Sequence, residues 1–193
     1  SEEFLAPCST GEDTYVLCPS CGFAANVEAM VTKVDAIDST ATPALEELDT
    51  PNTPTIDSLV QVLNERFGGG FTGASTLKNV MLIADGKAIS VLVPGDREVD
   101  LKRFQENLGG IHELRTFEDA DFAKFPGLVK GYIGPQNAQA LGITVYADPR
   151  VAPGSAWVTG ANKKDRHARN VVNGRDFVPD AYVEAAEVRA GDA

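Results

Sequence analysis

The sequence predicts an α+β fold in which helices flank a mixed, partly antiparallel sheet. Helical patterns alternate along the chain with short apolar runs, so helices and strands are interleaved. Two of these runs are separated only by Asp85-Gly86, a pair typical of a tight antiparallel hairpin. A chain of 193 residues can also bury one core without a disulfide or a metal ion.

The N-terminal part is not expected to form a domain of its own. Residues 4–7 and 14–17 resemble strands without evident partners, and residues 35–48 are rich in Thr, Ser, Ala and Pro, which predicts a loose linker. Cys18-Pro19-Ser20-Cys21 has the spacing of half a zinc site, but no second pair follows. Two reduced cysteines and no metal are favoured over a zinc site.

The first regular element is expected to be an amphipathic helix with apolar residues at helical spacing from Ile56 to Phe67. Thr53 is its predicted N-cap, Pro54 occupies the first helical position, and the glycines at 68–70 end it. The apolar runs 77–84 and 88–93 then form the hairpin, with Lys78 near the start of its first strand.

Further elements follow the hairpin. Residues 94–96 turn the chain into a helix whose apolar positions run from Val99 to Leu108, and Gly109-Gly110 ends that helix. A short helix is predicted over 118–125, and short strands over 143–147 and 157–159. The basic cluster 163–169 suits a solvated loop or a phosphate-facing patch equally well, and residues 176–193 are acidic and weakly periodic.

Charge and hydropathy limit the partners that the chain can take. The 28 acidic side chains outnumber the 17 basic ones, and the net charge of −11 opposes DNA binding and broad binding to nucleic acid. Any nucleic-acid contact is therefore expected to be small and local. The sequence has no apolar run long enough to span a membrane and no secretory pattern, and its three cysteines are an odd number. These features predict a cytoplasmic protein without a membrane partner.

A glycine-rich segment, Gly131-Tyr132-Ile133-Gly134-Pro135, predicts a tight turn whose backbone N–H groups could hold an oxyanion. By itself so short a pattern more often marks an ordinary loop. Taken alone, Lys78 suits a surface strand lysine and His167 a solvated loop histidine. With only two histidines and no Gly-x-Ser-x-Gly elbow, covalent catalysis has little support.

The order of the motifs resembles the editing domain inserted into bacterial-type prolyl-tRNA synthetases, which is related to free-standing aminoacyl-tRNA deacylases. The matching segments span nearly the whole chain: 11–13, 18–28, 49–52, 55–56, 77–78, 93–96, 131–135, 160–162, His167 and 174–176. The resemblance implies that family's fold and three parts of the chain. Residues 1–44 would adjoin the synthetase catalytic domain, 45–177 would be the editing domain, and 178–193 would return to the synthetase.

The activity implied by the resemblance is hydrolysis of alanine from proline tRNA. A synthetic site that fits proline rejects a smaller side chain by only about 1–3 kcal/mol per methylene, so a second sieve is needed. The implied partners are the acceptor end of proline tRNA carrying alanine and the remainder of the synthetase. No cofactor is expected in this chain, because ATP and magnesium would serve the missing catalytic domain.

The resemblance also implies the site residues. Lys78 would support the terminal nucleotide or the reacting ester, and the N–H groups from Gly131 to Gly134 would face the ester carbonyl. Pro135 would hold the turn in shape, and a free ribose hydroxyl of the tRNA would orient water. The implied substrate-binding residues are Ile56, Leu59, Tyr132, Ile133, Pro135, Gly160, Asn162 and His167, with plain core packing the alternative for Ile56 and Leu59.

Three other functions stay open from the sequence alone. The chain could be a non-catalytic module that positions the tRNA acceptor end, or a free-standing deacylase for another small aminoacyl-tRNA. A zinc-binding interaction domain is the third and least favoured.

Overall fold

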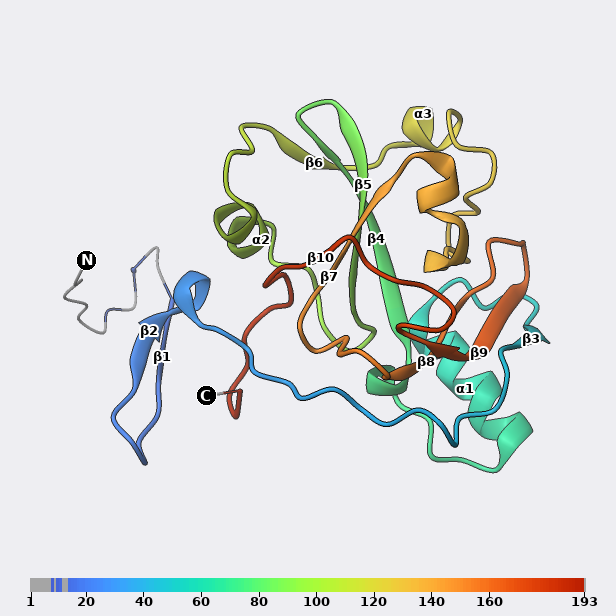
Figure 1. Ribbon diagram of the computed structural model, residues 1–193, viewed down its shortest axis with the longest axis horizontal. Helices are drawn as coiled ribbons and strands as arrows, with labels where there is room; N and C mark the ends of the chain where they lie inside the picture. The colour runs from blue at the N-terminus through green and yellow to red at the C-terminus, as the bar shows by residue number, and fades with distance from the viewer. Residues whose placement is uncertain (1–7, 9, 12–13, 193) are drawn as a thin grey trace.

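The computed structural model describes residues 8, 10–11 and 14–192 (Figure 1). Its centre is a five-stranded sheet with the strand order β10-β7-β5-β4-β6. Strand β4 pairs antiparallel with β5 and β6, whereas β7 runs parallel to β5 and to β10. The bounds of the strands are Leu77–Ala84 (β4), Lys87–Pro94 (β5), Leu114–Thr116 (β6), Thr144–Ala147 (β7) and Ala181–Tyr182 (β10). The predicted α+β class with a mixed sheet is confirmed.

The β4–β5 hairpin forms where the sequence predicts it. Asp85 and Gly86 connect the strands with φ angles of +45° and +79°, the left-handed conformation that a two-residue hairpin turn requires. The register pairs Lys78 with Val93, which places the lysine at the open end of the hairpin. Residues 95–98, which follow β5, are consequently brought next to the start of β4.

A second, three-stranded antiparallel sheet has the order β3-β9-β8, formed by Glu46–Asp49 (β3), Arg166–Val172 (β9) and Ala156–Gly160 (β8). The interpretation of 163–169 as a solvated loop is therefore wrong for the part that forms β9, and the predicted linker ends at β3 rather than after it. Charged residues of β3 and β9 pair with each other, which explains why each segment resembles a solvent-exposed one in the sequence. Arg169 of β9 pairs with Glu46 of β3 at 2.6 Å, while Leu48 alone in β3 is buried.

Helix α1 (Ile56–Phe67) begins two residues later than predicted, with Thr55 rather than Thr53 as its N-cap. The Thr55 hydroxyl accepts the Ser58 N–H and the Ser58 hydroxyl accepts the Thr55 N–H, a capping box. The Thr53 hydroxyl donates instead to the Thr50 carbonyl, at 2.7 Å. Gly68 ends the helix in the left-handed conformation, as predicted.

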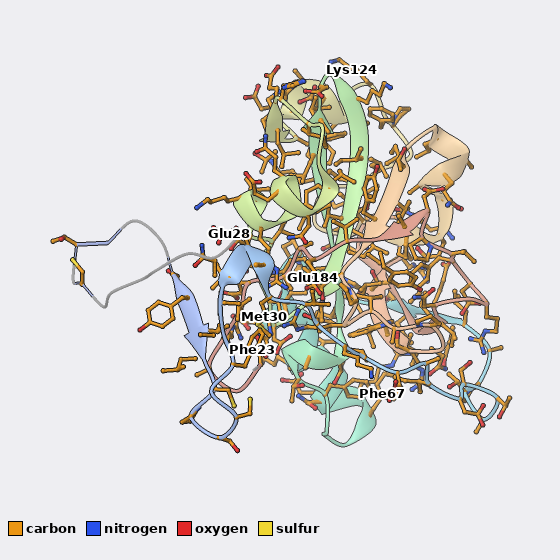
Figure 2. All side chains as sticks on the ribbon, turned by 60° about the vertical axis from the view of Figure 1, so that its left-hand side comes forward. Phe23, Glu28, Met30, Phe67, Lys124 and Glu184 are labelled. Atoms are coloured by element: carbon orange, nitrogen blue, oxygen red, sulfur yellow. The ribbon has the colours of Figure 1, made fainter. Side chains whose placement is uncertain are left out.

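The remaining helices are short. Helix α2 (Leu101–Leu108) is capped by Asp100 and ends before Gly109, and α3 (Asp119–Phe122) occupies part of the predicted 118–125 span. Val99, expected inside α2, forms a β-bridge with Ala186 instead. Single 3-10 turns lie at Val27–Ala29 (η1), Gly73–Ser75 (η2), Pro135–Asn137 (η3) and Gln139–Leu141 (η4). Figure 2 shows Phe67, the last residue of α1, at the opposite end of the molecule from Lys124, which follows α3.

Both faces of the central sheet are covered by apolar side chains. One face packs Leu82, Val91 and Val93 against Phe104 of α2 and against Ala185, which follows β10. The other face packs Met81, Leu92 and Val145 against Trp157 of β8. Residues close to the C-terminal end of the chain therefore contribute to the main core.

The N-terminal residues form a two-stranded hairpin beside the body of the molecule (Figure 1), in which β1 (Tyr15–Leu17) pairs with β2 (Ala24–Asn26). The expectation that 14–17 lacks a partner is wrong, while residues 4–7 lie outside the described residues. Cys18 and Cys21 are free thiols in the hairpin turn. Among the residues that the structure describes, no cluster of His, Cys, Asp and Glu could hold a metal ion. No helix in that part of the chain is long and apolar enough to cross a membrane.

Candidate active site

A cavity of about 710 Å³ opens where the two sheets meet α1. Its walls come from the start of α1, Gly73 of η2, the start of β4, the loop 95–98, the 131–133 turn, and the ends of β8 and β9 that meet in the β8–β9 hairpin. Seven of the residues implied by the resemblance line it: Ile56, Leu59, Lys78, Gly131, Ile133, Gly160 and His167. The other four residues lie behind the cavity wall and do not line it: Tyr132, Gly134, Pro135 and Asn162.

Lys78 reaches the cavity from the start of β4, at the open end of the β4–β5 hairpin. Its Nζ donates to the Arg97 carbonyl at 2.9 Å and to Glu98 Oε1 at 2.6 Å, and its side chain is 21% exposed. The ammonium group is therefore held at the cavity rim by the loop 95–98, rather than extended into solvent. A fixed cation at this position can attract a phosphate or stabilise a developing negative charge.

The backbone of the 131–135 turn contributes a wall of the cavity through Gly131 and Ile133. Gly131 has a φ of +87°, and a Cβ there would lie 2.8 Å from Pro54 Cβ, so only glycine fits without displacement. The Tyr132 N–H donates to the Val129 carbonyl. Within the described part of the chain, the backbone N–H groups of Gly131 and Ile133 have no hydrogen-bond partner. Both residues line the cavity.

Gly134 does not have the exposed donor that the sequence suggested. Its N–H donates to Asn162 Oδ1 at 3.0 Å, while Asn162 Nδ2 donates back to the Gly134 carbonyl at 3.1 Å. The expectation that the Gly134 N–H faces an ester carbonyl is corrected accordingly. Gly134 and Asn162 instead brace the turn from behind, and the Asn162 N–H adds a bond of 2.8 Å to the Tyr132 carbonyl.

The glycines of the turn and of β8 allow two backbones to touch. A Cβ on Gly160 would lie 2.1 Å from the Tyr132 carbonyl carbon, and a Cβ on Gly134 would lie 1.9 Å from the Gly160 oxygen. Both distances are far below any real carbon contact, so these positions require glycine. Pro135, which is buried, begins η3 directly behind this contact and stops the turn from continuing as a strand.

His167 lies in β9 and is 4% exposed, so the alternative of a solvated loop histidine is wrong. Its Nδ1 is 2.8 Å from Thr50 Oγ1, and its ring lies 5.3 Å from that of Tyr132, centre to centre. Burial lowers the pKa of His167 to about 4, so the ring is neutral near pH 7. Tyr132 supports this ring from behind, because its hydroxyl donates to Asp165 at 2.8 Å.

The apolar part of the cavity comes from the first turns of α1. Leu59 is 2% exposed and packs with Leu48, Leu63 and Val158, so it belongs to the core and lines the cavity as well. The two interpretations of this residue are therefore compatible. Ile56 is half-buried and lies closer to the cavity entrance.

Several polar lining residues were not foreseen from the sequence. Asn79 Nδ2 lies 3.3 Å from both the Ile133 carbonyl and Thr159 Oγ1, so it links β4 to the turn and to β8. Two successive polar residues, Lys78 and Asn79, in an otherwise apolar strand were the available signal. Asp57, Asp96 and Glu98 add carboxylates around the cavity, and of these only Asp96 lies in a segment that carries the family resemblance.

Comparison with known proteins identifies the family. The profile of the aminoacyl-tRNA editing domain matches residues 50–177, which include every lining residue of the cavity. The chain belongs to the aminoacyl-tRNA editing domain family. Deacylase activity is the chemistry that fits this family.

The relatives of this editing domain are larger proteins. Over its whole length it is 51% identical to proline–tRNA ligase 1 of Streptomyces avermitilis and 51% identical to the proline–tRNA ligase of Acidothermus cellulolyticus. It is 47% identical to that of Mycolicibacterium smegmatis. The chain spans about a third of these proteins, between 32% and 34% of their length.

Solved structures share the fold at low sequence identity. A protein proposed to be a trans-editing enzyme for prolyl tRNA synthetase matches 75% of this editing domain and 87% of its own chain. The TM-score is 0.54 and the identity is 16%. A hypothetical protein matches 75% of this chain and 92% of its own, with a TM-score of 0.57 and 15% identity. These structures support the fold and carry no information on the substrate.

Proposed function

We propose that this editing domain hydrolyses the ester between alanine and proline tRNA, as part of a proline–tRNA ligase. The observation that carries the proposal is the cavity itself, which brings a fixed cation, two free backbone N–H groups and a small apolar end together. The relatives that match the chain along its full length are proline–tRNA ligases. The ATP- and magnesium-dependent ligation is assigned to the parts of those proteins outside this chain, and the compartment is the cytoplasm.

The catalytic groups act on the ester carbonyl. In this proposal the carbonyl oxygen accepts hydrogen bonds from the Gly131 and Ile133 N–H groups, and Lys78 stabilises the negative charge or a nearby phosphate. The oxygen of a water molecule attacks the carbonyl carbon, and the free ribose hydroxyl of the tRNA orients that water. The ester bond to the ribose then breaks, the ribose oxygen takes a proton, and alanine and uncharged tRNA are the products.

His167 is assigned to size selection rather than to proton transfer. With a pKa of about 4 it is a weak base at neutral pH, and its Nδ1 already lies 2.8 Å from Thr50 Oγ1. In this proposal the part of the cavity lined by His167, Ile56 and Leu59 accepts a methyl group and excludes a pyrrolidine ring. Small apolar differences of this kind are what an editing sieve must detect.

The test compares the hydrolysis of Ala-, Cys- and Pro-tRNA(Pro) in single turnovers with the chain in excess. We expect Ala-tRNA to be hydrolysed and Pro-tRNA to be spared. Lys78→Ala should lower the rate roughly 100-fold or more, the usual effect of removing one oxyanion-stabilising group. Lys130→Ala, which removes an exposed lysine paired with Asp119, is the matched control.

Three results would contradict the proposal. An undiminished rate in Lys78→Ala would exclude the assigned role of the lysine, and equal hydrolysis of Pro-tRNA would exclude the sieve. Binding of tRNA without hydrolysis would favour the non-catalytic module. His167→Ala isolates size selection, because it should raise the rate on Pro-tRNA relative to Ala-tRNA.

A further inference from the structure

The position of Lys78 depends on the loop 95–98. Contacts with the β4–β5 hairpin alone do not hold this loop in place. Lys78 Nζ has two partners in the described residues, the Arg97 carbonyl and the Glu98 carboxylate. The Gly95 N–H donates to the Thr76 carbonyl, which ties one end of the loop to the start of β4. Beyond Gly95 the loop leaves the hairpin, so other contacts must fix it.

A segment far away in the sequence supplies those contacts. Residues 183–192, here called the C-terminal strap, hydrogen-bond to Asp96, Arg97, Glu98 and Asp100 and lie opposite Val99 in an isolated β-bridge. The Glu187 N–H donates to the Glu98 carbonyl at 2.9 Å, and the Glu98 N–H donates to Glu187 Oε1 at 3.0 Å. Arg97 forms a two-point ion pair with Asp192, at 2.7 and 2.9 Å. Arg189 also donates to the Asp96 carbonyl, and the Asp100 N–H donates to the Ala185 carbonyl, so that Val99 and Ala186 face each other in an antiparallel β-bridge.

The strap is itself anchored in the core. Asp148, which is fully buried, accepts the N–H groups of Ala185 and Ala186 at 3.0 and 2.7 Å. Glu184 pairs with buried Arg103 of α2, and Figure 2 shows Glu184 next to Met30, whose carbonyl also accepts from Arg103. Because the strap is anchored to buried residues, it can hold the loop 95–98 in a fixed position.

We propose that the C-terminal strap positions the Lys78 ammonium group, with Asp192 and Glu187 as positioning residues. The strap lies wholly outside residues 50–177, the part that matches the family profile. Asp192 fixes the Arg97 side chain, and Glu187 fixes the Glu98 backbone on both sides. Arg97 and Glu98 in turn supply the two partners of Lys78. The role in hydrolysis rests on the proposed function, whereas the effect on Lys78 itself does not.

The test uses the full chain and two variants that weaken different contacts. Asp192→Asn removes the charge from the pair with Arg97, and Glu187→Ala removes the acceptor of the Glu98 N–H. Asp119→Asn is the matched control, because it neutralises a carboxylate of an exposed pair with Lys130 at another part of the surface. Asp192→Glu keeps the carboxylate and is the conservative rescue. Thermal unfolding identifies any variant that no longer folds.

Two readouts separate positioning from stability. Acetylation of Lys78 by acetic anhydride, quantified by mass spectrometry against exposed Lys164, should rise several-fold in Asp192→Asn and Glu187→Ala and stay unchanged in Asp119→Asn. The rate constant kcat for Ala-tRNA should fall roughly 10- to 100-fold, since a displacement of about 1 Å can have this effect. Asp192→Glu should recover most of both changes.

The outcomes distinguish the two proposals. Unchanged Lys78 acetylation in folded Asp192→Asn and Glu187→Ala overturns the positioning role. If wild type does not hydrolyse Ala-tRNA, the proposed function fails, and acetylation still decides whether the strap positions the lysine. A uniform rise in the reactivity of all lysines would indicate that the whole fold has loosened, and it would also overturn the positioning role of the strap.

Discussion

Burial of His167 should make the stability of this editing domain depend on pH in a predictable direction. The folded pKa is about 4, against 6.5 for the exposed ring. Between pH 6.5 and pH 4 the unfolded chain binds a proton that the folded protein does not. The contribution of the neutral buried ring to the free energy of unfolding is therefore complete only above pH 6.5. It is lost as the pH falls from 6.5 to 4. One pKa unit corresponds to about 1.4 kcal/mol, so the total loss is about 3 kcal/mol.

The assay is urea unfolding at pH values from 7.5 to 4, followed by the fluorescence of the single tryptophan, buried Trp157. Carboxylates titrate in the same range, so the informative quantity is the difference between wild type and His167→Gln, which lacks the ionisable ring. That difference in unfolding free energy should shrink by about 3 kcal/mol on acidification. His112→Gln, which replaces the exposed second histidine, is the control. A difference that stays constant with pH would refute the reasoning.

Two further predictions concern packing around the site and behind it. Gly160→Ala must push β8 more than about 1 Å from the 131–135 turn, which should cost about 1–3 kcal/mol and reduce hydrolysis roughly 100-fold. Gly127→Ala, where a Cβ meets only flexible Leu141 at 3.3 Å, is its control in urea unfolding and single-turnover assays, and equal behaviour of the two would contradict the prediction. Glu184→Gln leaves the buried Arg103 charge uncompensated and should destabilise the fold by about 3–5 kcal/mol in urea unfolding. A loss below about 1 kcal/mol would show that Arg103 finds another partner.

The elements with local signals could be predicted from the sequence. The β4–β5 turn is set by Asp85-Gly86, and the ends of α1 and α2 by glycines that follow them. The start of α1 was predicted two residues too early, because Thr53 and Thr55 are both of a residue type that caps helices. Only the structure shows that Thr53 bonds to Thr50 and leaves Thr55 as the cap.

The strands β3 and β9 could not be predicted, because their stability comes from each other. Their charged side chains pair across the ladder, which gives each strand alone the appearance of a solvated segment. Strand β9 also shows no alternation of buried and exposed residues: the neighbours His167 and Ala168 are both buried, and a register shift relative to β8 follows between Ala168 and Val171. The cavity could not be predicted for the same reason, because its lining residues are spread along the chain between positions 54 and 167.

The brace between Gly134 and Asn162 carries no ionised group. The Asn162 amide contacts both the N–H and the carbonyl of one residue, Gly134, and the neighbouring wall consists of backbone against backbone. Neither contact responds to protons or to dissolved salt as a charged pair would. The shape of this wall should therefore be the same in dilute buffer and at high ionic strength. A dependence of hydrolysis on salt would then arise from charged groups rather than from this wall, that is, from the Lys78–Glu98 and Arg97–Asp192 pairs and from the approach of a polyanionic substrate to Lys78.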